Sequence, residues 1–242
     1  MVELNEYEKF RARPEGRPHM YQDWRDLLFL HYPVEPDALR NFIPEELEID
    51  TWDGMAWVGL VPFWMKNVRF PGVPALPYLS RFPETNVRTY VHKQCRNPGV
   101  WFFSLDAARY IAAQSARYSY GLPYHHAHMT AERNGDLVEY RSKRVWRSGS
   151  VNIRAKLGKK LPHAERGSLE HFLIERYLLY AKNRGKLLSV QVHHQRYPLQ
   201  EAELLHVEES LTKADGLEPN PYSHVIFSPG VDVELFARRP PR

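Results

Sequence analysis

Apolar residues along this chain recur mostly in short runs or with a period of two, a pattern that is typical of β-strands. Residues 85–93 and 99–105 form two such segments with a short turn between them, and residues 47–65 suit a strand pair around an Asp-Gly turn. An Asn134-Gly135 pair marks a further tight hairpin. Other strands are expected at 27–34, 187–197, 203–209, 223–227 and 231–236. The pattern predicts a sheet-dominated protein.

Three segments have helical features instead. Residues 36–42 open with Pro36, which suits the first turn of a helix. Residues 106–119 are rich in alanine, with Asp106 placed as the N-terminal cap, and residues 168–182 space apolar residues at helical intervals. Because helices and strands do not alternate regularly, we expect an α+β fold with a mostly antiparallel sheet and two or three packed helices.

The ends of the chain differ in character. Residues 1–24 are polar and charged, and we expect them to form an arm on the surface. No internal repeat is visible in the remainder, so residues 25–242 are expected to form one domain. Four prolines within residues 70–83 predict an irregular loop between two strands.

The composition suits a folded protein of a reducing compartment. The chain has 242 residues, 43% of them hydrophobic, so it can bury a large core. Cys95 is the only cysteine, which excludes an intrachain disulfide. The most apolar run, residues 57–65, is too short to span a membrane, and the net charge of +4 does not demand an anionic partner. We therefore expect a cytoplasmic protein.

The strand that precedes Lys93 carries the most informative polar residues. Successive side chains of a strand point to opposite faces, so four polar residues share one face: Glu84, Asn86, Arg88 and Tyr90. That face either meets water or lines a cavity. In a cavity every polar group needs a partner, so Glu84 would pair with Arg88, or a ligand carboxylate or carbonyl would take its place.

Most of residues 27–236 resembles the uncharacterised YqjF-like bacterial family. The resemblance rests on several segments together, among them FPETNVRTYV, GVWFFSLDAAR, GLPY, LIERYLLYA and YSHVIFSPGVDV. This family lies within the acetoacetate-decarboxylase-like superfamily. The resemblance therefore implies a strand-rich cone or barrel that encloses one pocket.

The resemblance also implies which pocket residues are kept. Glu84 stands at the position of a pocket acid. Tyr124 and His125 stand where the decarboxylase has two adjacent lysines, the first of which forms a Schiff base with a ketone. A second pocket acid is replaced near Val61, and the pocket arginine corresponds to His31. Because a phenol cannot form an imine, the resemblance argues against Schiff-base chemistry.

Histidine clusters leave a metal site open as an alternative. On a strand, His126 and His128 would share a face, as two zinc ligands do, and His193 or Glu84 could supply a third ligand. No recognised metal-binding spacing accompanies them. We expect no metal and no other cofactor.

Basic residues offer a second alternative. Arg141 and Lys143 alternate along one face of a predicted strand, where they could follow the phosphates of a polyanion. Glu139 shares this face and no aromatic residue interleaves it, which favours an ordinary solvated surface. Lys159 and Lys160 are adjacent, but they are expected in a solvated loop away from the pocket.

Three functions remain open at this point. The first is a pocket protein that binds an organic acid or carbonyl compound. Its ligand-binding residues are expected to be His31, Asn86, Arg88, Tyr90 and His125. If it is an enzyme, Glu84 and Tyr124 exchange protons with the bound compound, as in a lyase or isomerase that needs no imine. The second is a non-catalytic binder or sensor with the same pocket, and the third is a polyanion-binding module. We expect a small-molecule ligand and neither nucleic acid nor membrane as a partner, and homo-oligomer formation stays open.

Overall fold

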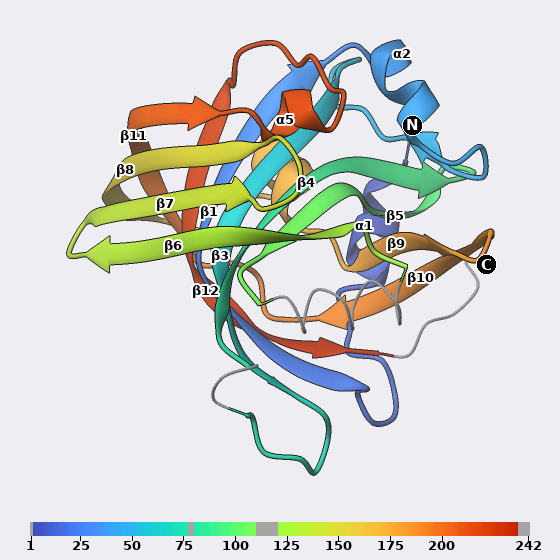
Figure 1. The fold of residues 1–242 in the computed structure, drawn as a ribbon. Coiled ribbons are helices and arrows are strands. Elements are labelled where there is room, and N and C mark those ends of the chain that lie inside the picture. Colours follow the sequence, from blue (N-terminus) through green and yellow to red (C-terminus); the bar gives the residue numbers. More distant parts are fainter. Residues whose placement is uncertain (1, 77–79, 110–120, 237–242) are drawn as a thin grey trace.

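The chain folds into one strongly curved, 12-stranded sheet with short helices around it (Figure 1). The computed structural model describes residues 2–76, 80–109 and 121–236. The strands are β1 (Met20–Val34), β2 (Glu48–Ile49), β3 (Ala56–Arg69), β4 (Phe82–Lys93), β5 (Arg96–Ala107), β6 (Tyr124–Asn134), β7 (Leu137–Arg144), β8 (Ser150–Leu161), β9 (Leu178–Asn183), β10 (Lys186–His193), β11 (Leu199–Glu209) and β12 (His224–Leu235). The helices in this part of the chain are α1 (Leu4–Lys9), α2 (Pro36–Leu39), the 3-10 helix η1 (Arg40–Phe42), α4 (Leu169–Ile174) and α5 (Leu211–Ala214).

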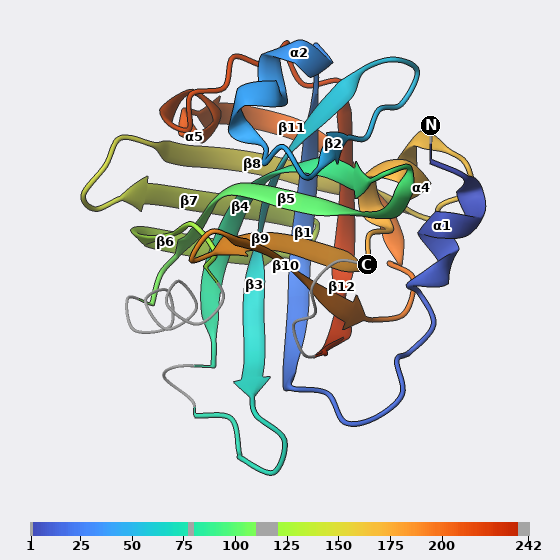
Figure 2. The ribbon, with the colours of Figure 1, turned by 90° about the vertical axis from the view of Figure 1, so that its right-hand side faces the viewer.

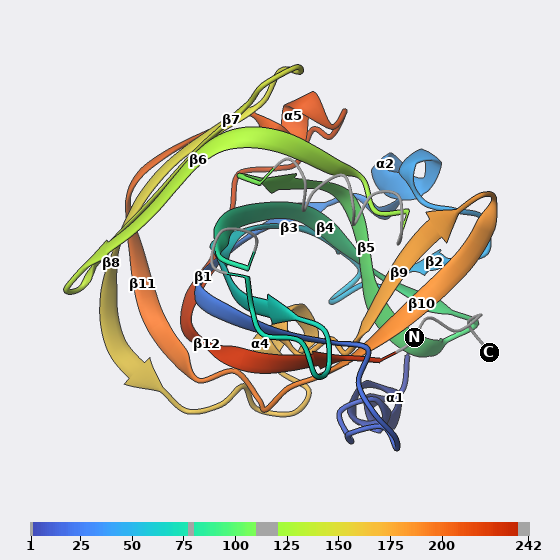
Figure 3. The ribbon, with the colours of Figure 1, turned by 60° about the horizontal axis from the view of Figure 1, so that its bottom comes forward.

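Part of the sheet closes into a barrel. The strand order is β10-β9-β5-β6-β7-β8-β11-β12-β1-β3-β4-β2, and two additional pairings, β10–β12 and β5–β4, join distant parts of it. They close a ring that runs β10-β9-β5-β4-β3-β1-β12 and returns to β10. Within this ring only β5 and β9 pair in parallel. Strands β6, β7, β8 and β11 wrap around one side of the ring as an outer layer, as Figure 3 shows.

The two layers bury two hydrophobic cores. The first lies inside the barrel and includes Phe82 and Tyr90 of β4. The second lies between the barrel and the outer layer, and it includes Val87 and Val91 of β4 together with Ile153 of β8. Because both faces of β4 are covered, the strand is buried along nearly its whole length. The predicted alternation along β4 is confirmed, with the polar side chains on the interior face.

The two ends of the barrel differ. At one end α4 lies across the interior, where Phe172 and Ile174 join the first core (Figure 3). Ser168 caps this helix, because its Oγ accepts a hydrogen bond of 3.2 Å from the backbone N–H of His171. At the other end the loop between β3 and β4 extends beyond the strands (Figure 2).

The predicted strand-rich, mostly antiparallel barrel is confirmed, and so are most of the predicted elements. Residues 85–93 and 99–105 lie in β4 and β5. The loop predicted at 70–83 follows β3 as expected, although its last two residues, Phe82 and Pro83, already belong to β4 and residues 77–79 lie outside the described part of the chain. The helix expected at 36–42 is present as α2 followed by η1. In the segment expected to be an arm, residues 4–9 form α1 and residues from Met20 onward belong to β1.

One pair of predicted strands is a single strand. Residues 223–227 and 231–236 were expected to be separate, but β12 runs through both. Gly230 allows this continuity: its φ is +124°, and a Cβ atom at this position would lie 2.1 Å from the carbonyl oxygen of Trp24. No other residue type fits so close to β1 with this backbone conformation.

One helix prediction and one helix-cap prediction were wrong. The helix expected over 168–182 ends at Ile174, and its second half forms β9, which pairs with both β10 and β5. This pairing completes the barrel, so tertiary contacts override the helical spacing. Asp106 does not cap a helix but lies in β5, fully buried, while residues 110–119 fall outside the described part of the chain. Within the described residues, no helix is long and apolar enough to cross a membrane.

Candidate functional site

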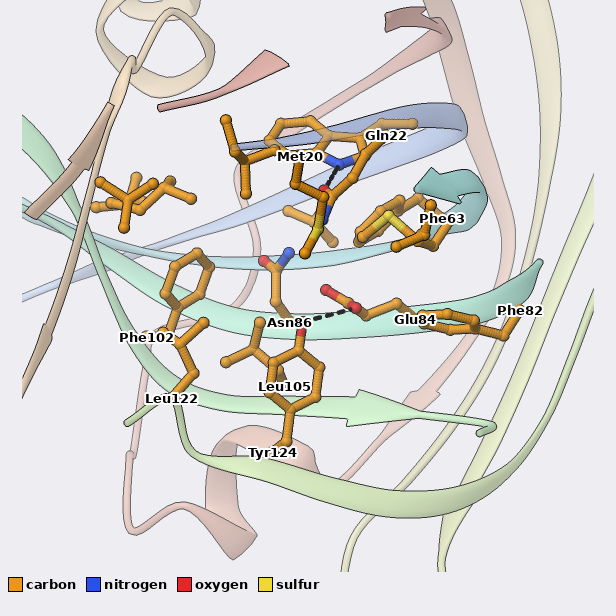
Figure 4. Close-up of a pocket in the computed structure, with 18 of the residues that line it drawn as sticks. Met20, Gln22, Phe63, Phe82, Glu84, Asn86, Phe102, Leu105, Leu122 and Tyr124 are labelled. Carbon is orange, nitrogen blue, oxygen red and sulfur yellow. Dashed lines mark hydrogen bonds between the residues drawn. The ribbon is translucent and has the colours of Figure 1, made fainter. Parts of the chain in front are cut away.

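A cavity of about 340 Å³ lies inside the barrel. Glu84, Asn86 and Arg88 of β4 line it, and we call these three residues the polar stripe. Figure 4 shows Glu84 and Asn86. The other strands contribute mainly aromatic and aliphatic side chains to the wall. The expectation of a polar pocket is thus corrected to a mostly apolar cavity with one polar stripe.

Glu84 and Tyr124 form a hydrogen-bonded pair at the wall of this cavity. The Tyr124 hydroxyl donates to Glu84 Oε2 over 3.0 Å (Figure 4). Tyr124 is the first residue of β6, which pairs in parallel with β5 so that Tyr124 lies opposite Leu105. Glu84 lies opposite Ala107 on the other side of β5. The short parallel pairing thus brings together two groups that are forty residues apart in the chain.

The carboxyl group of Glu84 favours its protonated form. Burial raises the pKa of Glu84 to about 8, and the nearby charge of Asp106 acts in the same direction, while the hydrogen bond from Tyr124 opposes them. At neutral pH the group is therefore mainly a neutral acid. A pKa close to the working pH suits a group that both donates and accepts protons.

Arg88 and Asn86 present unsatisfied polar atoms. The Nε of Arg88 and the Oδ1 of Asn86 are buried and have no hydrogen-bond partner among the described residues. Arg88 Nη2 donates a long bond of 3.5 Å to the carbonyl oxygen of Leu173, and its guanidinium lies over the rings of Phe29 and Tyr90. The expected ion pair between Arg88 and Glu84 is not formed in the described structure, because Glu84 bonds Tyr124 instead.

A second guanidinium in the cavity wall has a neutralising partner. Arg176, which follows α4, donates from Nη1 to Asp50 Oδ2 over 2.7 Å, and from Nε to the carbonyl oxygen of Phe172 over 2.8 Å. Its Nη2 has no partner among the described residues. Arg88 differs from Arg176 in this respect: it is buried, and its positive charge has no carboxylate partner among the described residues.

Two of the predicted ligand-binding residues, His31 and Tyr90, are not among the side chains that line the cavity. They lie next to Arg88 in the barrel interior, where His31 Nε2 is 2.8 Å from the Tyr90 hydroxyl. Gly59 leaves the space for this contact, since a Cβ atom there would lie 3.3 Å from all three side chains. Burial, with smaller contributions from His224 and Arg88, lowers the pKa of His31 well below its usual value. His31 is thus a neutral supporting residue in this arrangement.

Comparison with known proteins identifies the family. The model of the DUF2071 family, described as an uncharacterized conserved protein, matches residues 21–232. The chain belongs to this family. It is 40% identical to the uncharacterized protein YqjF of Bacillus subtilis strain 168. The match extends over 215 residues, which are 87% of this chain and 88% of YqjF. The resemblance to the YqjF-like family is confirmed.

Solved structures confirm the expected fold. The enduracididine biosynthesis enzyme MppR, complexed with a condensation product of pyruvate and imidazole 4-carboxaldehyde, matches with a TM-score of 0.64 at 14% identity, over 93% of this chain and 89% of that one. An acetoacetate decarboxylase matches with a TM-score of 0.61 at 15% identity, over 93% and 89% of the two chains. The acetoacetate decarboxylase of Legionella pneumophila matches with a TM-score of 0.58 at 12% identity, over 98% and 97%. At these identities the likeness establishes the acetoacetate-decarboxylase-like fold alone.

Lysine is absent from the wall of the cavity in the described part of this DUF2071 chain. Lys159 and Lys160 are exposed at the end of β8 in the outer layer, not in the loop where they were expected. On the neighbouring hairpin, Arg141 forms an ion pair with Glu139 and stays exposed. These basic groups belong to the outer surface of the protein.

His125 and the histidine clusters lie outside the cavity wall as well. His125 follows Tyr124 on β6, opposite Asp106, and it is not one of the cavity-lining side chains. The rings of His126 and His128 are 5.9 Å apart, whereas His193 Nδ1 faces the carbonyl oxygen of Arg11 at 3.0 Å. The proposed metal ligands are therefore not gathered at one point.

A different trio within the described residues has the spacing of a metal site. Potential ligand atoms of Glu48, His92 and Cys95 lie within 4.8 Å of one another at the β4–β5 turn. The Nδ1 atom of His92 already accepts a hydrogen bond of 3.2 Å from the backbone N–H of Cys95. This trio is separate from the polar stripe, because His92 lies near the end of β4, beyond both Arg88 and Tyr90.

Sequence reasoning missed the contribution of β1 to the cavity. Met20, Gln22 and Trp24 line it, although they belong to the segment expected to be a surface arm. Trp24 Nε1 donates to Gln22 Oε1 over 2.9 Å, and Figure 4 shows Met20 and Gln22 on the side of the cavity opposite Tyr124. The spacing of these three residues, two apart, is typical of one face of a strand and could have indicated that β1 starts at Met20.

Proposed function

We propose that the cavity binds a small organic acid or carbonyl compound, with Arg88 and Asn86 as its polar anchors. The observation that carries the proposal is Arg88 Nε, a buried donor that has no partner among the described residues, on a guanidinium that pairs with no carboxylate there. Asn86 Oδ1 is also buried and unpartnered, and as an acceptor it suits a hydroxyl group or a protonated acid of the ligand. Buried polar atoms are costly unless something satisfies them, and a ligand carboxylate suits a guanidinium well. MppR, which shares the fold, has been solved with pyruvate bound, which supports a ligand of this class.

In this proposal Glu84 and Tyr124 move a proton to and from the ligand. The ionised form of Glu84 takes a proton from the carbon next to the ligand carbonyl, and the electron pair of the broken C–H bond moves onto the carbonyl oxygen. The Tyr124 hydroxyl donates a hydrogen bond to that oxygen. Return of the proton from Glu84 to that carbon, while the electron pair leaves the oxygen to restore the carbonyl, completes an isomerase-like exchange without a covalent intermediate.

Schiff-base chemistry does not enter the proposal. The cavity wall offers no lysine among the described residues, and Tyr124 carries a phenol where an imine would need an amine. Treatment with borohydride in the presence of a ketone or oxo acid should therefore leave no adduct. Mass spectrometry that finds a reduced adduct on any lysine contradicts this part of the proposal.

Deuterium exchange tests the reaction directly. We expect the protein in D₂O to catalyse exchange at the carbon next to the carbonyl of oxo acids that are long enough to reach Glu84 from Arg88, as measured by proton NMR against protein-free buffer. Glu84→Gln keeps the size of the side chain but cannot act as a base, so exchange should fall by about a hundredfold or more while binding persists. Glu139→Gln, a substitution at a half-buried position of β7 that does not line the cavity, is the matched control and should not change exchange.

The binding part of the proposal has its own test. Arg88→Met should weaken binding of the same oxo acids by about tenfold or more, because hydrogen bonds to charged groups contribute roughly 1.5–3 kcal/mol. If ligands bind with an Arg88 dependence but no exchange occurs, the protein is a non-catalytic binder and the catalytic proposal fails. If no organic acid or carbonyl compound binds, the whole proposal fails.

A further inference from the structure

The cavity has a closed inner end. Arg88 is the innermost member of the polar stripe that lines it, since Tyr90, two residues further along β4, is no longer part of the wall. Ile174 and Arg176 line the same region, and Arg88 reaches the carbonyl oxygen of Leu173 in α4. The end of α4 thus forms a floor of the cavity, against which lie the guanidinium groups of Arg88 from β4 and of Arg176 from the segment after α4.

The opposite end of the cavity is mostly apolar, with Arg69 at the end of β3 as a charged residue of its wall. β4 begins there with Phe82, which pairs with Met65 of β3, and both side chains line the cavity. The β3–β4 loop adds Phe70, Val73 and Leu76, whose exposed fractions are 52%, 49% and 56%. Large apolar side chains on a surface commonly mark a place where an apolar partner or ligand passes. The outer end of the cavity is therefore a mostly apolar mouth with one arginine, Arg69, in its wall.

The cavity is larger than a short oxo acid. A water molecule takes about 30 Å³ in the liquid, so the volume of about 340 Å³ corresponds to roughly eleven waters. Arg88 and Glu84 are four residues apart on a strand, which separates their Cα atoms by about 13 Å. A short oxo acid with its carboxylate at Arg88 leaves the apolar outer half of the cavity unfilled.

We infer that the ligand is a medium-chain organic acid with an apolar tail. Its carboxylate lies at Arg88 on the floor, its middle part passes Asn86 and Glu84, and its tail extends along the apolar wall toward the mouth. This inference rests on the proposed function, because it uses the same anchors. It adds the chemical class of the ligand: an amphiphilic carboxylate rather than a small, fully polar acid.

Titration calorimetry with butanoic, hexanoic, octanoic and decanoic acids tests the inference. Each buried methylene should lower Kd about fourfold, until the tail reaches the mouth and the gain stops. Octanol and octylamine have a similar tail without a carboxylate, and they should bind at least about tenfold more weakly than octanoic acid.

A pair of matched variants locates the tail. Val68 lines the cavity on β3 close to the loop, so Val68→Trp should obstruct the outer half and weaken decanoic acid by about tenfold or more, with little effect on butanoic acid. Val225 on β12 is also half-buried but does not line the cavity, and Val225→Trp should leave the whole series unchanged. Melting curves show whether both variants fold. The chain-length series measured with the wild-type protein tests the inference even if a variant does not fold.

The outcomes separate the two proposals. A series in which affinity does not rise with chain length, although Arg88→Met still weakens every acid, overturns the amphiphilic ligand and leaves the proposed function standing. If octanol and octylamine bind as tightly as octanoic acid, the cavity does not anchor a carboxylate. That result overturns both proposals.

Discussion

His31 and His224 face each other through their Nδ1 atoms, which are 3.0 Å apart in the wall of the barrel. One of the two atoms must carry a proton and the other must accept it. If the Tyr90 hydroxyl donates to His31 Nε2, His31 donates to His224, whose Nε2 then points its proton toward the Glu170 carboxylate at 3.8 Å. Both rings are neutral in this arrangement, which agrees with the lowered pKa that burial gives each of them.

Replacing His31 should therefore cost stability. His31→Phe fills a similar space but leaves the Tyr90 hydroxyl and His224 Nδ1 without their buried partner. Since each unsatisfied group costs about 1–3 kcal/mol, we expect the free energy of unfolding to fall by roughly 2–5 kcal/mol in urea denaturation. His128→Phe, at an exposed position of β6, should change it by less than about 0.5 kcal/mol. Equal effects of the two substitutions would show that the buried contacts contribute nothing.

Glu84 should make the protein less stable in alkaline solution. Its pKa is about 8 in the folded protein against an ordinary value of 4.5, so the folded state holds a proton that the unfolded state has released between these two values. Stability from this group is present below pH 4.5 and is lost as the pH rises through 8. Glu84→Gln mimics the neutral carboxyl and removes this loss.

Urea denaturation of both proteins between pH 5 and pH 9 measures the effect. The free energy of unfolding of Glu84→Gln relative to the wild type should rise with pH, by an amount on the order of a few kcal/mol, since one pKa unit corresponds to about 1.4 kcal/mol. A difference that stays constant over this range would mean that Glu84 is ionised throughout.

The polar stripe shows what the sequence can predict about a site. Period two along β4 was enough to place Glu84, Asn86 and Arg88 on one face, and the resemblance was enough to bring Tyr124 near Glu84. Partners could not be assigned in the same way, because residue spacing along one strand does not fix hydrogen bonds that involve other strands. The expected pair of Glu84 with Arg88 gave way to the pair with Tyr124 for this reason.

The same limit explains the errors in the fold. Residues 178–181 satisfy both a helical and a strand pattern, and only their pairing with β5 and β10 decides between them. Met20, Gln22 and Trp24 look like part of a polar arm until β1 is known to extend through them. In both cases the deciding contacts join residues that are far apart in the sequence.

Tyr124 should tune the acidity of Glu84. The hydrogen bond from the Tyr124 hydroxyl stabilises the carboxylate form, so Tyr124→Phe should raise the pKa of Glu84 further. Carbon-13 NMR of the side-chain carboxyl of Glu84 follows its titration without any need for a substrate. Tyr222→Phe, at an exposed tyrosine, is the control and should leave the titration where it is. An unchanged or lower pKa in Tyr124→Phe would show that the two groups do not bond in solution.

A buried ionic network beside the site should be essential for folding. Arg144 of β7 is almost fully buried and donates from Nε to Asp106 over 2.9 Å and from Nη1 to Asp215 over 2.7 Å. It also donates from Nη2 to Ser104 Oγ over 2.6 Å. These contacts tie the barrel strand β5 to the outer layer and to the segment after α5.

Removal of Arg144 leaves two buried carboxyl groups without their cation, which typically costs about 3–5 kcal/mol. We therefore expect Arg144→Met to lower the free energy of unfolding by this amount at pH 7. Arg144 also holds down the pKa of Asp106, which burial raises to about 6, so the variant should recover part of its stability at pH 5, where Asp106 becomes protonated and loses its buried charge. Arg141→Met removes an exposed arginine from the same strand and should change stability by less than about 0.5 kcal/mol at either pH. A loss in Arg144→Met that is no larger than in this control would mean that the network does not join the two layers.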